Sequence, residues 1–162
     1  MPPQPFVDDS AGVSAELTGK GRFQTALHLH GQMILADEPV EVGGLASGPT
    51  PYELLSGSLA ACTAMTMRLY ADRKGWELPP FRIEVVHAPP LAASERDRFM
   101  RRIHIAGPID EERKSKLLEI ANRCPVHRTL ERGFDISTDV GEQPDSGEPT
   151  KQHMIDMEAA CA

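Results

Sequence analysis

The sequence predicts an α+β protein, with strands and helices in largely separate parts of the chain. Several short stretches alternate between apolar and polar residues, one long helical segment near the middle is uncharged over most of its length, and an amphipathic helix follows it. The expected order is a run of strands, a long helix, two strands, a helix and a strand, which favours α+β over a doubly wound parallel sheet. At 162 residues and 40% hydrophobic content, the chain is expected to build one core.

The expected strands are 13–18, 23–30, 33–36, 81–87, 100–106 and 134–140. The first two flank the turn Gly19-Lys20-Gly21 and so form a β-hairpin, and Gly31 turns the chain into the third. Residues 13–140 are expected to form the domain. Residues 1–12 are read as a flexible leader and 141–162 as a flexible C-terminal tail, the end of which forms a short helix or frays.

The long helix is expected to begin at Thr50 and to end before Gly75. Thr50 and Glu53 have the spacing of a capping box, and Pro51 suits the first helical turn. Residues 54–67 carry no charge, so the helix is expected to be buried on most sides. That run is too short and too rich in small polar residues to span a membrane.

Two faces of this helix differ in character. One carries small residues: Gly57, Ala60, Ala61 and Ala64. The opposite face carries Leu55, Leu59, Cys62, Thr66 and Leu69. The small-residue face would let another helix or subunit approach closely. Cys62 on the other face is either a buried structural thiol or a reactive one, and its place on the helix does not decide between them.

A second helix is expected at 109–123, with three acidic residues in its first turn. Pro125 ends it and is well placed to begin another helical turn directly after Cys124. A thiol at a helix N-terminus, with His127 and Arg128 nearby, has its thiolate favoured electrostatically. The separation of 62 residues from Cys62 excludes a local CxxC motif, so the two cysteines can meet only through the fold.

Charge and cysteine content restrict the class of protein. The net charge of −7 argues against a general nucleic-acid or anionic-membrane surface. Three widely spaced cysteines are too few for a secreted disulfide framework, and no secretory signal is recognised. Reduced thiols in the cytoplasm are therefore expected.

Two segments resemble the OsmC/Ohr family of osmotically inducible and organic-hydroperoxide-resistance proteins, with details closer to its OsmC-like branch. They are GPTPYELLSGSLAACTAMTMRLYADRKGW (48–76) and CPVHRTL (124–130). The resemblance implies an OsmC-like fold, with two long central helices packed against antiparallel sheets in an interlocked homodimer. It also implies a thiol peroxidase without metal or organic cofactor, in which Cys62 is the peroxidatic and Cys124 the resolving cysteine. The partners would be a hydroperoxide and an external dithiol reductant.

The same resemblance implies an arginine that polarises the peroxidatic thiolate, held in place by the glutamate that Glu53 matches. Arg22, after Gly19-Lys20-Gly21, resembles the arginine of the glycine-rich turn in the Ohr branch. We therefore expect Arg22 to activate Cys62. Phe23 follows where that branch usually has an acid, and residues 42–50 lack the arginine of the OsmC branch.

Three other interpretations compete with a peroxidase. One is a non-catalytic, dimeric stress-associated or ligand-binding domain that keeps the thiols. Another is a metal site, because His28 and His30 share one face of a strand and Cys124 and His127 have metal-like spacing. The third is a Cys62–His127 hydrolase dyad, for which the sequence carries no oxyanion-hole signature.

Overall fold

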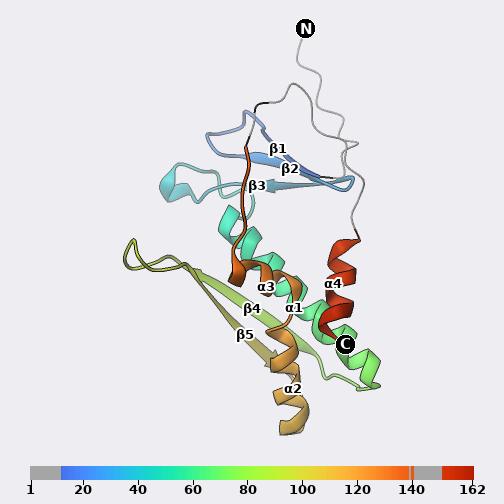
Figure 1. Cartoon of the computed structure of the whole chain (residues 1–162). Helices are drawn as coiled ribbons and strands as arrows, with labels where there is room; N and C mark the ends of the chain where they lie inside the picture. Colours follow the sequence, from blue (N-terminus) through green and yellow to red (C-terminus); the bar gives the residue numbers. More distant parts are fainter. Residues whose placement is uncertain (1–11, 139, 141–150) are drawn as a thin grey trace. The chain divides into compact units, whose positions relative to one another are not determined.

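The structure is a computed structural model that describes residues 12–138, 140 and 151–162. The chain forms two compact units. The first contains the described residues up to Pro51 and those that follow Ile136 as far as Val140; the second contains Tyr52–Ile136 and Lys151–Ala162. The elements of both are labelled in Figure 1.

The first unit is a three-stranded antiparallel meander of β1 (Val13–Leu17), β2 (Thr25–Leu29) and β3 (Gln32–Ala36). This confirms the predicted hairpin, in which Leu17 pairs with Thr25 across the glycine-containing turn. A loop with the short 3-10 helix Val40–Val42 follows β3. The carboxylate of Asp37 organises this loop by accepting hydrogen bonds from the N–H groups of Leu45 and Ser47 and from the Ser47 hydroxyl.

The predicted long helix is α1 (Pro51–Lys74). Its buried face consists of Ser56, Leu59, Cys62, Thr63, Thr66, Met67, Tyr70 and Ala71. Gly57, Ala61 and Met65, on the other side, are exposed, and Met65 keeps 54% of its surface. The helix has two different faces, as the sequence predicts. The further expectation that it is buried on most sides is wrong, because only one face is buried.

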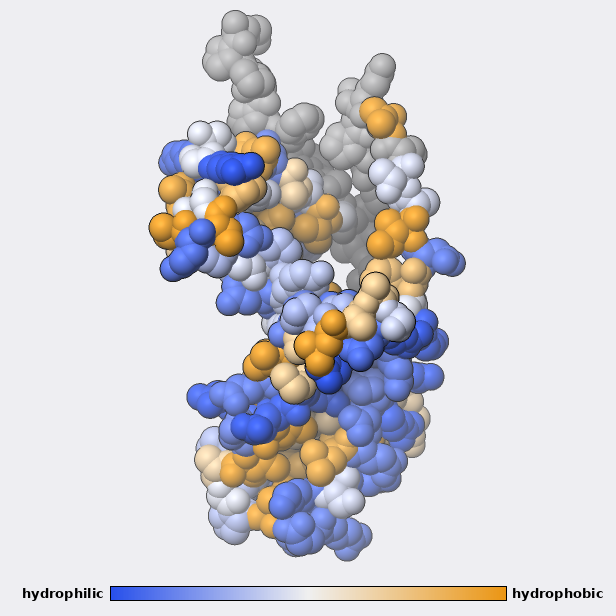
Figure 2. All heavy atoms as spheres, turned by 90° about the vertical axis from the view of Figure 1, so that its left-hand side faces the viewer, coloured by the Kyte–Doolittle hydropathy of each residue, from blue (hydrophilic) through white to orange (hydrophobic). Residues whose placement is uncertain are grey.

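The second unit also contains a hairpin of β4 (Phe81–Ala88) and β5 (Arg98–Ile105). Its alternate residues pack toward α1 and toward α2 (Glu111–Ala121), where Met67, Leu117 and Ala121 form the centre of a core. Asp110 caps α2 by accepting a hydrogen bond from the N–H of Arg113. Figure 2 shows apolar side chains gathered between polar ones in its lower part, which is the second unit.

Two short helices complete this unit: α3 (Pro125–Arg132) and α4 (Gln152–Ala160). Residues 151–162 are expected to form a short helix or to fray, and the structure contains the helix. Helix α4 lies beside α1 in Figure 1, with Met157, Ala160 and Cys161 buried. Cys161 joins Tyr70 and Ile120 in a core cluster, so apolar burial holds the helix in place.

The prediction of a strand at 134–140 is wrong for its described residues, 134–138 and 140. Neither sheet of the described chain includes them, and Phe134, Ile136 and Val140 are exposed. Alternation alone does not make a strand, because a strand also needs an edge with which its backbone can form hydrogen bonds. No helix in the described part of the chain combines the length and the apolar composition needed to cross a membrane.

Candidate functional site

The structure brings the two predicted cysteines together. Cys62 lies in the middle of α1, and Cys124 is the N-cap residue of α3. With Leu59 they form one buried cluster, in which Cys62 is 2% exposed and Cys124 is fully buried. The N–H of Val126, in the first turn of α3, donates a hydrogen bond to Sγ of Cys62 at 3.4 Å. Both sulfurs therefore lie at the N-terminus of α3.

Cys62 is held as a protonated thiol. The hydrogen bond between its sulfur and that of Cys124, together with burial, raises the pKa of Cys62 far above its ordinary value. The N–H of Val126 opposes that effect without reversing it. A second nitrogen, Nε2 of His153 at the start of α4, lies 3.2 Å from Sγ of Cys62.

Cys124 is held as the thiolate. The hydrogen bond from Cys62 is the main cause and, against the effect of burial, the pKa of Cys124 falls to about 5. The backbone N–H of His127, the hydroxyl of Thr63 and the charge of Arg101 also lower the pKa of Cys124. The interaction with His127 does not amount to a capping hydrogen bond. Oγ1 of Thr63 lies 3.6 Å from Sγ of Cys124, and a guanidinium nitrogen of Arg101 lies 3.9 Å from it.

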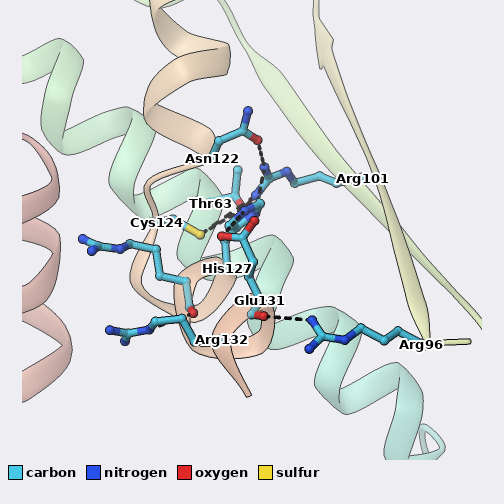
Figure 3. A network of polar contacts seen from close by, with 9 residues as sticks. Thr63, Arg96, Arg101, Asn122, Cys124, His127, Glu131 and Arg132 are labelled. Carbon is cyan, nitrogen blue, oxygen red and sulfur yellow. Dashed lines mark hydrogen bonds and ion pairs between the residues drawn. The ribbon is translucent and has the colours of Figure 1, made fainter. Parts of the chain in front are cut away.

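Arg101 is fixed by three further partners, which Figure 3 shows around its guanidinium group. It donates to the hydroxyl of Thr63 at 2.9 Å and to Oδ1 of Asn122 at 2.7 Å, and Nδ1 of His127 lies 3.4 Å away. The hydroxyl of Thr63 lies 2.7 Å from the carbonyl oxygen of Leu59 and 3.6 Å from Sγ of Cys124, and its single proton can serve only one of these two acceptors. The cation that faces the thiol pair therefore has little freedom to move.

This arrangement places one negative charge and one thiol proton on a pair of sulfurs. Cys124 has the guanidinium group and is the better nucleophile at neutral pH, because the thiolate is the reactive form. Cys62 retains its proton until a base removes it. Two thiols that are hydrogen-bonded to each other can also be joined in a disulfide.

A hollow of about 210 Å³ lies next to this pair. Its apolar wall is formed by Leu59, Phe99 and Leu130, which also pack in the cysteine cluster. Its polar part is formed by Arg96, Asp97, His127 and Glu131. A small molecule with an apolar body and a polar end could bind here, against residues that pack around the cysteine cluster.

The other two predicted site residues are Arg22 and Glu53. Arg22 belongs to the first unit, is exposed, and has its guanidinium carbon 5.0 Å from the centre of the Phe23 ring. Glu53 lies in the first turn of α1. Activation of Cys62 by Arg22 therefore stays a prediction.

Sequence reasoning missed Arg101 and His153. Residues 99, 101, 103 and 105 share the inner face of β5, and the other three are Phe99, Ile103 and Ile105. The available signal is a cation in an otherwise apolar row. Nothing in the sequence linked His153 to Cys62, because the contact depends on how α4 packs.

The metal interpretation gains no support from the described residues. Among them, no three His, Cys, Asp or Glu side chains lie close enough together to hold an ion. Nε2 of His28 lies 3.3 Å from a carboxylate oxygen of Glu16, which gives this histidine an ordinary partner on the neighbouring strand.

Residues 44–139 match the model of the family described as OsmC-like protein. Three solved structures are similar to the chain in fold. A candidate osmotic stress induced and detoxification response protein from Psychrobacter arcticus is 23% identical with a TM-score of 0.59, and the match covers 72% of this chain and 86% of that one. An OsmC-like protein from Mycoplasma pneumoniae is 22% identical with a TM-score of 0.59, at coverages of 74% and 86%.

The third, from Legionella pneumophila, is named an organic hydroperoxide resistance protein OsmC and a predicted redox protein; it is 18% identical with a TM-score of 0.55, at coverages of 74% and 87%. None of the curated proteins matches the chain. The family match spans more than half of the sequence, including both cysteines, and the fold agrees. The chain belongs to the OsmC-like family.

Proposed function

We propose that this protein is a thiol-dependent peroxidase that reduces organic hydroperoxides through Cys62 and Cys124. The observation that carries the proposal is the buried pair of Cys62 and Cys124, which lies beside a fixed guanidinium group and at the N-terminus of α3. A pair that served only for packing would not need a cation, a hydroxyl and helix N–H groups around its sulfurs. A hydroperoxide resistance function is also named for a protein of the same fold.

In the first step, Sγ of Cys62 attacks the terminal oxygen of the hydroperoxide. The O–O bond breaks, the alcohol leaves, and Cys62 becomes a sulfenic acid. In the second step, the thiolate of Cys124 attacks the sulfur of Cys62 and forms the disulfide, and the hydroxide leaves as water after taking one proton. The low pKa of Cys124 suits this second step, because the attacking group is then already charged.

The hollow beside the cysteines supports an apolar substrate. The apolar wall of the hollow is formed by Leu59, Phe99 and Leu130. An alkyl or aryl hydroperoxide can bury its apolar group against this wall, whereas hydrogen peroxide has no apolar group to bury. We therefore expect kcat/KM for cumene hydroperoxide to exceed that for hydrogen peroxide.

The disulfide would be reduced by an external dithiol, in a cytoplasm that keeps thiols reduced. We further propose that the working form is a homodimer, because the Gly57 and Ala61 side of α1 is uncovered in the single chain. A second copy packed there would bury this face.

The test is a titration of free thiols against cumene hydroperoxide. The reaction predicts two thiols lost per hydroperoxide, with no such loss in Cys62→Ser and an unchanged loss in Cys161→Ser. A dione probe that labels sulfenic acids then identifies the sulfur that attacked the hydroperoxide. In Cys124→Ser, the probe should label Cys62. Unreactive thiols would favour the non-catalytic, dimeric binding domain, whereas stoichiometric sulfenic acid on Cys124 would reverse the roles of the two cysteines.

A further inference from the structure

Helix α4 lies beyond residue 139, where the match to the family model ends, yet it contacts the reacting pair. Its far end is anchored to α1. Arg73 donates to the carbonyl of Glu158 at 3.0 Å, and Sγ of Cys161 donates to the carbonyl of Thr66 at 3.6 Å. Met157 and Ala160 are buried between these contacts. This anchoring holds His153, at the beginning of α4, against Cys62.

Cys62 needs a base before it can attack a hydroperoxide. The guanidinium group of Arg101 contacts the sulfur of Cys124, and the described contacts of Cys62 include no cation of this kind. Cys124 is a poor base for the purpose, because the guanidinium group 3.9 Å from its sulfur stabilises the thiolate and so weakens its attraction for a proton. The other candidate in contact with Sγ of Cys62 is Nε2 of His153, and imidazole is the side chain that most often moves protons near neutral pH.

We propose that His153 is the general base that removes the proton from Cys62 and delivers it to the departing alkoxide. This inference rests on the proposed peroxidase reaction. The proton passes from Sγ of Cys62 to Nε2 of His153 as sulfur bonds to the terminal peroxide oxygen. The O–O bond breaks with its electron pair on the alkoxide oxygen, which takes the proton from His153. The net change is thiol plus hydroperoxide to sulfenic acid plus alcohol.

The position of His153 suits a proton carrier. Its ring contacts the sulfur of a buried thiol, while the residue as a whole is exposed to solvent. A proton can therefore pass between the buried pair and water without movement of α1 or α3. The C-terminal helix thus supplies a catalytic residue, and the reaction depends on a segment outside the matched family region.

The test measures the rate at which cumene hydroperoxide produces dione-labelled Cys62 in a chain that also carries Cys124→Ser, with the label assigned to Cys62 by peptide mapping. His153→Gln should slow labelling by at least about a hundredfold, because a general base typically contributes about 10²–10⁴-fold to the rate. The matched control is His104→Gln, because His104 lies on the outer face of β5 and pairs with Glu84 at 2.7 Å. It should label at the parent rate.

A second variant separates chemistry from packing. In His153→Ala, added imidazole should restore part of the lost rate, and the temperature of unfolding should match that of the parent. Labelling of His153→Gln at the rate of His104→Gln would overturn the inference, as would a slow His153→Ala protein that imidazole does not accelerate. In both cases the parent still reacts. A parent protein that forms no adduct would instead overturn the peroxidase proposal itself.

Discussion

Removal of the charge of Arg101 should raise the pKa of Cys124. A guanidinium nitrogen lies 3.9 Å from its sulfur. At this separation, two unit charges attract each other by about 1 kcal/mol in water and about 4 kcal/mol at an effective dielectric constant of 20. Arg101 is half-buried, so the effect should fall between these limits. At 1.36 kcal/mol per pH unit, Arg101→Met should move the titration of Cys124 upward by about 1 to 3 pH units.

The assay is the pH dependence of iodoacetamide alkylation in a chain with Cys62→Ser and Cys161→Ser, which leaves Cys124 as the single thiol. Serine keeps a hydroxyl donor at position 62, so Arg101→Met is compared with this parent. The matched control is Arg102→Met, because Arg102 is the next residue along β5 and lies on its exposed face. An unchanged Arg101→Met profile, or an equal shift in both variants, would refute the assignment of Arg101 to the Cys124 thiolate.

Three further predictions concern the core, the predicted arginine and the assembly. Leu117→Ala should lower the free energy of unfolding in urea by about 2–5 kcal/mol, because Leu117 is 1% exposed; Leu118→Ala, at a position 48% exposed, should cost far less, and equal losses would contradict the described core. Arg22→Ala should raise the pH at which Cys62 alkylates if Arg22 activates it, and an unchanged profile would leave the role to other groups. Sedimentation at micromolar concentration should show a dimer, and a monomer would contradict the proposed cover of the Gly57 face.

Much of the fold could be predicted because the signals were local. The capping pattern and charge-free run of α1, the hairpin turn after β1 and the acidic first turn of α2 depend on neighbouring residues alone. The pairing of Cys62 with Cys124 came from the family resemblance. Their separation in the chain could exclude a CxxC motif, but it could not bring them together.

The electrostatics of the site could not be predicted in this way. The charge on Cys124 depends on Arg101 and Thr63. These two residues come from different elements, β5 and α1, and meet at the sulfur only in the folded chain. The role proposed for His153 depends on how α4 packs, and the sequence indicated at most that a short helix forms there. The strand expected at 134–140 failed for the opposite reason: its alternating pattern was present, but its described residues joined neither sheet.

The central claim is that Cys62 and Cys124 are partners in one redox reaction. Its most direct test is peptide mapping of the protein after treatment with one equivalent of cumene hydroperoxide under non-reducing conditions. The proposed reaction predicts a peptide in which Cys62 and Cys124 are joined within one chain, with Cys161 still a free thiol. Recovery of Cys62 and Cys124 as free thiols, or of disulfides formed only through Cys161, would contradict it.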